Sequence, residues 1–211
     1  MRPICLRCQR PLRACLCAWV RPTSNRLPVL VLQHPHEAGH AKGSVRLLQC
    51  SLAHCTVQVG DHFDPAALAA WLGAAGTSLL LYPDAAGVPA RADASVASIG
   101  PPDLPPLPAR LVLLDGTWRQ ARGLLRAHPL LQALPRWGLP VVAPPRYAIR
   151  RAHLPAQRST LEAACTALGV LEGRTAHYAP LLEAFSGWVS QLAARAEAGC
   201  PLSAACPGAG S

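Results

Sequence analysis

Long apolar runs are missing from this sequence. Apolar runs such as residues 27–32 and 79–82 fall far short of the roughly 20 apolar residues that a membrane-spanning helix needs. The basic N-terminus also lacks the apolar stretch of a secretory signal peptide. These absences exclude a membrane-spanning protein, and we expect a cytoplasmic one.

Lysine is almost absent, and acidic residues are missing from two long segments. Lys42 is the single lysine among 20 cationic residues. Residues 1–26 contain six arginines and no acid, and residues 110–158 contain nine arginines and one acid, Asp115. A GC-rich genome would explain arginine in place of lysine, but it would not remove acids from the same segments. Because guanidinium groups suit phosphates and stack on bases, both segments predict surfaces that bind nucleic acid.

The nine cysteines are not expected to form a disulfide framework, because the chain shows no export signal. Two close pairs near the N-terminus have the spacing of metal ligands, with a sharp turn within each pair: Cys5-x2-Cys8-x6-Cys15-x-Cys17. Four thiolates in this arrangement predict a closed, tetrahedral and structural Zn²⁺ site. Metal binding would also order a segment too short to have its own core. The alternative is four reduced cysteines that bind no metal.

Strand and helix patterns alternate along the rest of the chain. Apolar runs typical of strands covered on both faces lie at residues 28–32, 56–59, 78–82, 110–114 and 141–143. Helical patterns lie at residues 42–53, 65–75, 117–134 with a break near Pro129, 160–171 and 176–198. This alternation predicts an α/β fold with a mostly parallel sheet flanked by helices. Ligands of such sheets bind at the carboxyl ends of the strands.

The length of 211 residues, 51% of them apolar, suffices for one domain and a small module. We expect a zinc-binding module at residues 1–26, an α/β domain at 27–198 with a Pro/Gly-rich loop at 85–109, and a flexible tail at 199–211. Three of the remaining cysteines are expected to be buried as small apolar residues: Cys50, Cys55 and Cys165. The last two, Cys200 and Cys206, lie in the tail and carry no assignment.

The segment Asp115-Gly-Thr-Trp118 follows the strongest predicted strand. Asp115 would stand at the carboxyl edge of the sheet, and Thr117 can cap the next helix. Trp118 begins that helix beside Arg119 and Arg122, and an exposed indole next to cations is typical of nucleic-acid surfaces. The alternative is local: Asp115 and Thr117 only cap the helix, and Trp118 only packs.

Two other segments place polar groups after predicted strands. Ser159 and Glu162 form a capping-box pattern, which leaves a helix N-terminus able to hold a carboxylate or a phosphate. The loop before it adds cations at 145–151. His34-Pro-His-Glu37, with His40 nearby, follows the first strand and suggests a metal site, a ligand-binding loop or plain loop polarity.

Together these segments resemble the DTW-domain family. The features that match, in family order, are the four N-terminal cysteines, Leu32-Gln-His-Pro-His-Glu37, Ser44-Val-Arg-Leu-Leu48, Leu81-Tyr-Pro83, Leu114-Asp-Gly-Thr-Trp-Arg-Gln-Ala121 and Ser159-Thr-Leu-Glu-Ala163. The resemblance implies a fold related to SPOUT-type methyltransferases, knotted or nearly so. It also implies transfer of the 3-amino-3-carboxypropyl group from S-adenosylmethionine to N3 of a tRNA uridine, which gives acp3U and 5′-methylthioadenosine.

The resemblance assigns residues to this reaction. The catalytic residues would be Asp115 and Trp118. The S-adenosylmethionine site would comprise Leu81, Tyr82, Pro83, Leu114, Asp115, Gly116, Thr117, Arg158, Ser159 and Thr160. The tRNA would contact His34, Glu37, Arg46, Arg119, Arg122, Arg150 and Arg151. Asp115 would be either the general base for the uridine N3–H or the anchor of the ammonium group of S-adenosylmethionine, and Trp118 would stack on the base or wall the pocket.

Three other functions fit parts of the pattern. A related fold would also suit an S-adenosylmethionine-dependent RNA methyltransferase. A zinc protein that only binds RNA would need the basic segments but not Asp115. A metal-dependent hydrolase would use His34, His36 and Glu37. The sequence leaves open which uridine is modified and the oligomeric state.

Overall fold

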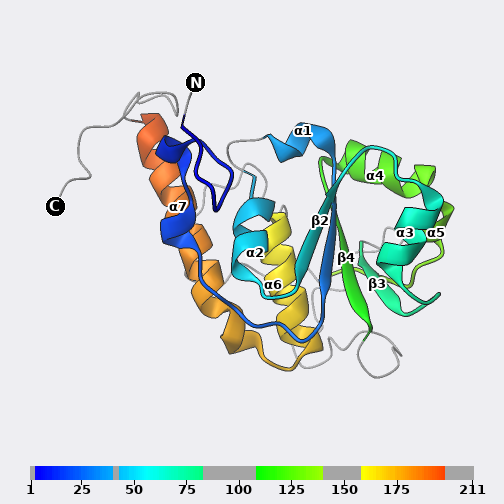
Figure 1. Ribbon diagram of the computed structural model, residues 1–211. Coiled ribbons are helices and arrows are strands. Elements are labelled where there is room, and N and C mark those ends of the chain that lie inside the picture. The colour runs from blue at the N-terminus through cyan, green and yellow to red at the C-terminus, as the bar shows by residue number, and fades with distance from the viewer. Residues whose placement is uncertain (1–2, 40–42, 83–107, 140–157, 198–211) are drawn as a thin grey trace.

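The computed structural model describes residues 3–39, 43–82, 108–139 and 158–197 (Figure 1). Its centre is a sheet of five parallel strands in the order β2-β1-β4-β3-β5. The strands are β1 (Val29–Gln33), β2 (Cys55–Val59), β3 (Ser78–Leu81), β4 (Arg110–Asp115) and β5 (Arg136–Trp137). The parallel sheet and four of the predicted strands are therefore confirmed. The fifth, at 141–143, lies outside the described residues, and the short β5 was not predicted.

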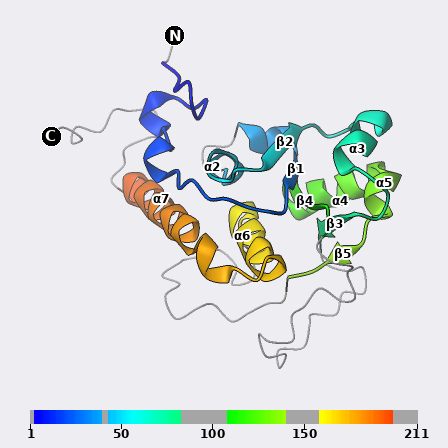
Figure 2. The ribbon, with the colours of Figure 1, turned by 60° about the horizontal axis from the view of Figure 1, so that its bottom comes forward.

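Helices cover both faces of the sheet (Figure 2). One face carries α2 (Val45–Ser51), α6 (Thr160–Leu171) and α7 (Ala179–Glu197), and the other carries α3 (Pro65–Leu72), α4 (Trp118–Ala127) and α5 (Pro129–Gln132). The break predicted near Pro129 is confirmed, since proline at the first position of α5 has no N–H to continue α4. None of the helices in the described part of the chain is long and apolar enough to cross a membrane.

The segment after β1 differs from its prediction as a loop. It contains a one-turn helix, α1 (Pro35–Ala38). Proline is preorganised for the first helical position, and His34 caps the turn by accepting the backbone N–H of His36. The pattern His-Pro followed by polar residues carried this signal, but four residues are too few to show a helical period.

The alternation of side chains along β1 and β4 divides the core in two. Val29, Val31, Leu111 and Leu113 pack in the cluster under α2, α6 and α7, whereas Leu30, Leu32 and Val112 pack in the cluster under α3, α4 and α5. Because side chains alternate faces with period two, the next residues of the first set, Gln33 and Asp115, lie on the α6 face. The two are also register partners at the carboxyl edge. The sheet thus delivers a buried amide and a carboxylate to one place.

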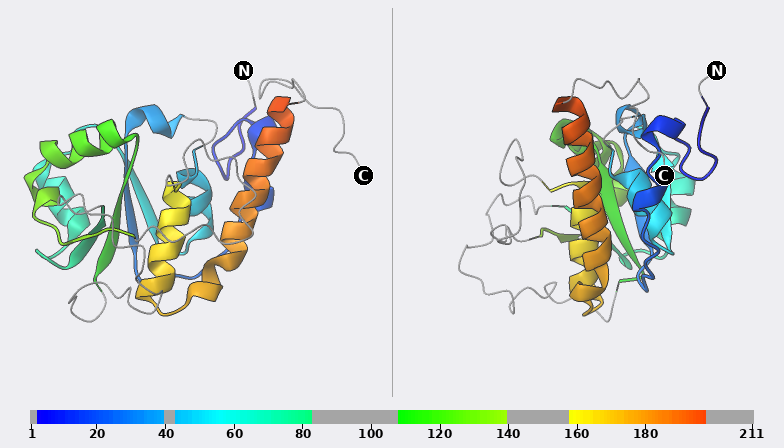
Figure 3. Two further views of the ribbon diagram at one scale, coloured as in Figure 1. Left: turned by 180° about the vertical axis from the view of Figure 1, so that it is seen from behind. Right: turned by 90° about the vertical axis from the view of Figure 1, so that its left-hand side faces the viewer.

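The N-terminal segment packs along α7 (Figures 1 and 3). The Trp19 ring lies over Gly187, where a Cβ would be 2.5 Å from the ring, and its indole N–H donates to Gln191 Oε1 at 3.2 Å. The Arg10 guanidinium lies 5.6 Å from the centre of the Trp188 ring. A glycine on α7 is therefore required for the close approach of this segment.

A buried histidine joins the helices of the second face. His128 stands between α4 and α5 at 3% exposure, and its Nε2 accepts the backbone N–H of Phe63 at 3.3 Å. Its ring lies 5.0 Å from that of His62. Burial, followed by the neighbouring His62, lowers the pKa of His128 below its usual 6.5. The folded protein therefore holds this imidazole neutral.

This neutral histidine predicts acid-sensitive stability. Below pH 6.5 the unfolded chain binds a proton that folded His128 resists, so the free energy of unfolding should fall as the pH drops toward the lowered pKa. One proton contributes at most about 1.4 kcal/mol per pH unit. Urea denaturation of the wild type and His128→Gln between pH 7.5 and 5.0 measures this. The wild type should lose more stability than the variant, and equal slopes would contradict the account.

Candidate functional site

The Asp115 carboxylate is held by two neutral donors at the carboxyl end of β4. Its Oδ2 accepts the side-chain N–H of Gln33 at 2.9 Å, and its Oδ1 accepts the hydroxyl of Thr160. Gln33 is buried at 7% exposure, while Asp115 is half-buried. Each carboxylate oxygen retains capacity for a further hydrogen bond. The group is therefore oriented and still able to accept a proton or bind a cation.

The start of α6 fixes the position of Thr160. Ser159 and Glu162 form the predicted capping box: the Ser159 N–H donates to Glu162 Oε2 at 2.8 Å, and the Glu162 N–H donates to Ser159 Oγ at 3.3 Å. Between these two residues, the Leu161 N–H donates to Ser44 Oγ at 3.4 Å. These bonds make Thr160 the first helical residue, facing Asp115. Arg158 is exposed just before the cap.

The turn between β4 and α4 is built around Gly116. A Cβ at this residue would lie 3.0 Å from Gln120 Cβ, which is a tight contact, and 3.5 Å from His34 Cβ, which is an ordinary one, so a side chain would press on Gln120. Thr117 caps α4 as predicted, and Gln120 completes a capping box by accepting the Thr117 N–H at 2.6 Å. The Thr-x-x-Gln spacing in the sequence is typical of this capping box.

Trp118 is exposed beside the capped end of α4, with 54% of its surface accessible. Its ring meets that of Tyr82 edge to face, with centres 6.0 Å apart at 73°. Tyr82 and Leu81 stand half-buried at the end of β3, and Leu114 packs partly into the core under α4. Arg119 and Arg122 are exposed on the same helix. Among the other predicted residues, Pro83, Arg150 and Arg151 lie outside the described ranges.

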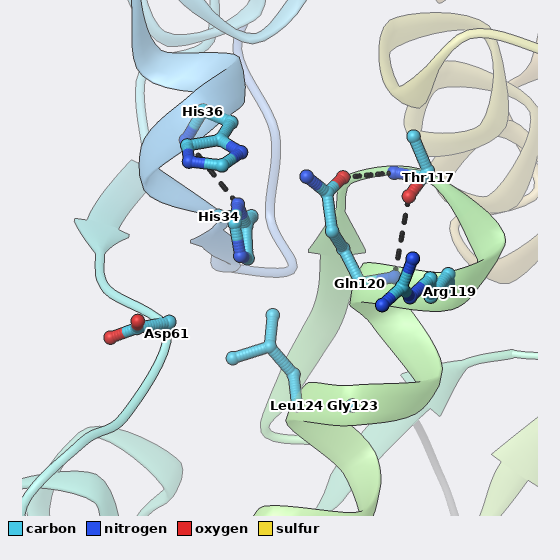
Figure 4. Close-up of a pocket in the computed structure, with 8 residues that line it drawn as sticks. All are labelled: His34, His36, Asp61, Thr117, Arg119, Gln120, Gly123 and Leu124. Atoms are coloured by element: carbon cyan, nitrogen blue, oxygen red, sulfur yellow. Dashed lines mark hydrogen bonds between the residues drawn. The ribbon is translucent and has the colours of Figure 1, made fainter.

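A pocket of about 630 Å³ opens between α1 and α4 (Figure 4). Its lining consists of His34, His36, Asp61, Thr117, Arg119, Gln120, Gly123 and Leu124. His34 and Asp115 adjoin through the backbone, because the His34 N–H donates to the Asp115 carbonyl at 2.9 Å. The pocket and the carboxylate therefore share one edge of the sheet.

Sequence reasoning missed Asp61 as part of this pocket. It follows β2, so the rule that ligands bind at strand ends could have found it. Glu37, predicted to join the histidines, lies on α1 outside the pocket lining. Within the described ranges the metal-ligand atoms of His34, His36 and Glu37 do not converge, and the four cysteines are the one cluster that does.

The cysteine cluster is compact enough to hold a metal ion. The four sulfur atoms of Cys5, Cys8, Cys15 and Cys17 all lie within 4.8 Å of one another, with Cys5–Cys17 at 3.6 Å and Cys8–Cys15 at 3.7 Å. Tetrahedral Zn–S bonds of about 2.3 Å would place the sulfurs about 3.8 Å apart. Backbone N–H groups of Cys8 and Arg7 lower the pKa of Cys5 to about 6, whereas burial raises the pKa values of Cys15 and Cys17. The support for a metal site is therefore the spacing of the sulfur atoms.

Arg46, which the resemblance assigns to the tRNA, lies against this cluster. Its Nε donates to the Cys8 carbonyl at 2.9 Å, and one terminal nitrogen donates to the Arg7 carbonyl at 3.2 Å. The other terminal nitrogen donates to Gln49 Oε1 at 2.7 Å. The guanidinium thus links helix α2 to the cysteine hairpin, the turn that the antiparallel Ile4–Pro11 pair closes and that carries Cys5 and Cys8.

The architecture defines an α/β domain with a polar site at the carboxyl edge of a parallel sheet and an N-terminal cysteine cluster, able to hold a metal ion, packed on its last helix. The chain belongs to the DTW-domain family, whose pattern matches residues 2–193. The family resemblance is therefore confirmed over nearly the whole chain.

Three relatives show the same kinship. The chain is 34% identical over 178 residues to "tRNA-uridine aminocarboxypropyltransferase 2" of Mus musculus, covering 81% of this chain and 57% of the mouse protein. Identity to the Drosophila melanogaster protein of the same name is 33%, over 81% of this chain and 67% of that protein. Identity to "tRNA-uridine aminocarboxypropyltransferase A" of Arabidopsis thaliana is 30%, over 62% of this chain and 53% of the plant protein. The chain thus spans little more than half the length of the mouse relative. No solved structure matches.

The Thr160–Asp115 hydrogen bond predicts a measurable contribution to stability. Thr160→Val keeps the shape of the side chain but removes the donor to the carboxylate. Bonds to charged groups contribute about 1.5–3 kcal/mol, and partial exposure lowers this to about 1–2 kcal/mol. Urea denaturation at pH 7 should show this loss for Thr160→Val and little for Thr160→Ser, which keeps the hydroxyl. Equal stability of the valine variant and the wild type would refute the bond.

Proposed function

We propose that this chain transfers the 3-amino-3-carboxypropyl group from S-adenosylmethionine to N3 of a tRNA uridine, forming acp3U and 5′-methylthioadenosine. The names of the mouse, fly and plant relatives support this activity. The observation that carries the proposal is the Asp115 carboxylate, oriented by Gln33 and Thr160 at the edge where parallel sheets bind ligands. If the Asp115 carboxylate took no part in the reaction, the proposal would be refuted.

The reaction requires a specific carbon of the sulfonium to face the uridine. All three carbons on sulfur are electrophilic, so the carbon held in line with N3 decides which group is transferred. The new bond joins N3 to the γ-carbon of the methionine moiety, the bond between that carbon and sulfur breaks, and 5′-methylthioadenosine leaves with the electron pair. The N3 proton must also depart. We assign its removal to Asp115, whose two held oxygens still have free lone pairs.

The remaining predicted residues divide between the two substrates. The S-adenosylmethionine side would comprise Leu81, Tyr82, Pro83, Leu114, Gly116, Thr117, Arg158, Ser159 and Thr160. The exposed Trp118 would stack on a base, and a base-paired uridine would have to flip out to present N3. His34 and Arg119 would bind RNA in the pocket between α1 and α4. Further contacts to the RNA would come from Glu37, Arg122, Arg150 and Arg151.

Three finer predictions belong to the same proposal. The metal of the cysteine cluster would be Zn²⁺, because four thiolates at tetrahedral spacing suit it. The chain path would be related to that of SPOUT-type methyltransferases, knotted or nearly so, and the parallel sheet with helices on both faces supports that relation. The location would be the cytoplasm, where reduced cysteines persist.

Removing the carboxylate charge tests the function. Wild type, Asp115→Asn and the control Glu183→Gln, an exposed change on α7, are incubated with labelled S-adenosylmethionine and total tRNA, and the nucleosides are analysed by mass spectrometry. Wild type and Glu183→Gln should yield acp3U. General acid–base catalysis is worth about 10²–10⁴-fold, so Asp115→Asn should lose at least about 100-fold while still melting as a folded protein.

Other products would decide among the other functions. A methylated nucleoside would make the chain a methyltransferase. Binding of tRNA without any product, and with no effect of Asp115→Asn, would leave an RNA-binding protein.

The metal assignment predicts about one Zn²⁺ per chain. Cys8 is the buried ligand, with 1% of its surface exposed, so Cys8→Ser should lose most of the metal and lower the melting temperature. Cys55→Ala is the matched control, because Cys55 lies outside the cluster. Elemental analysis of the three purified proteins provides the measurement. Full zinc content in Cys8→Ser, or none in the wild type, would contradict the assignment.

A further inference from the structure

Arg46 is a residue of α2, the helix that contacts the start of α6, and its side chain reaches the metal-binding hairpin. Its guanidinium spans the carbonyls of Arg7 and Cys8 and is steadied by Gln49 one turn further along α2. Three nitrogens of the group therefore already have acceptors in the protein, and the side chain is half-buried. These bonds use three of the five guanidinium N–H groups and fix the orientation of the side chain, so a phosphate contact would be limited to the two that remain.

The carbonyls that Arg46 holds belong to the half of the hairpin that carries Cys8. Cys8 is the most buried of the four ligands, and its sulfur lies 3.7 Å from that of Cys15. Four thiolates around a divalent cation would carry a net charge of about −2, which an adjacent guanidinium offsets. Residues that orient ligands in this way commonly change metal affinity by about 10–100-fold when they are replaced.

The same helix also contacts the start of α6. Ser44 stands at the N-cap of α2, and its Oγ accepts the Leu161 N–H at 3.4 Å. The neighbouring Thr160 donates to Asp115. Leu47 and Leu48 of α2 are fully buried in the cluster that includes Leu161. A short and continuous set of contacts therefore joins the hairpin to the carboxylate.

We propose that Arg46 is a positioning residue of the metal site: it fixes the Arg7–Cys8 backbone for metal binding and fastens the hairpin to α2. Through Ser44, α2 in turn steadies the first turn of α6. Arg46 therefore serves the metal site and does not bind RNA phosphate. This assignment stands independently of the reaction that the chain catalyses.

Lysine at this position separates the two roles. Arg46→Lys keeps the positive charge that a phosphate contact needs, but one ammonium cannot span two carbonyls and Gln49. A role in metal binding therefore predicts a defect in Arg46→Lys, whereas a role in RNA binding predicts near-normal behaviour. Arg122→Gln is the matched control, because Arg122 is exposed on α4.

The experiment measures zinc affinity of the full chain against a chelator of known affinity, alongside tRNA binding by the zinc-loaded protein at several salt concentrations. Arg46→Lys should bind zinc about 10–100-fold more weakly, with an unchanged salt slope for tRNA. Arg122→Gln should keep wild-type zinc affinity. Wild-type zinc affinity in Arg46→Lys would overturn the proposal, and so would a tRNA salt slope that falls by about one in Arg46→Gln, which removes the charge.

Hydrogen exchange of the unmutated chain supplies a test that does not depend on a variant folding. Zinc removal should speed exchange in α2 and in the first turn of α6, while α3 stays protected. Unchanged exchange in α2 would overturn the link. A chain that passes these tests but yields no acp3U would refute the proposed function and leave the role of Arg46 intact.

Discussion

The hydrogen bonds that converge on the Asp115 carboxylate join three elements that lie far apart in the sequence. Gln33 ends β1, Asp115 ends β4 and Thr160 begins α6. Their meeting requires parallel pairing of β1 with β4 in one register, because a shift by one residue would send Asp115 to the opposite face. It also requires α6 to begin at Thr160, which the Ser159–Glu162 capping box ensures. The site thus depends on a register and on a helix start.

Much of this arrangement is visible in the sequence, and the reasons are local. Four apolar runs predict β1 to β4, and the caps at Thr117 and Ser159 appear as short motifs. Gln33 is different, because its role comes from a pairing across 82 positions that no local pattern encodes. Asp61 and the two-residue β5 were also missed, since neither carries a periodic signal. Long-range contacts therefore account for most of what sequence reasoning lacked.

The arginines show the same division between composition and structure. Their clustering without acids predicts a surface for nucleic acid, and Arg119 and Arg122 are indeed exposed beside Trp118. Composition could not distinguish them from Arg46, whose guanidinium donates to two hairpin carbonyls, or from Arg10, which lies over the Trp188 ring. Some of the arginine side chains therefore hold the cysteine hairpin against α2 and α7. Charge alone overstates the surface available to RNA.

We propose that the carboxyl edge around Asp115 and Thr160 receives S-adenosylmethionine. A crystal structure of the chain with S-adenosylmethionine and a short uridine-containing RNA would test this placement. The account predicts the aminocarboxypropyl chain beside α6, with the uridine N3 within hydrogen-bond reach of the Asp115 carboxylate. An adenosyl group bound elsewhere, with Asp115 touching neither molecule, would contradict it.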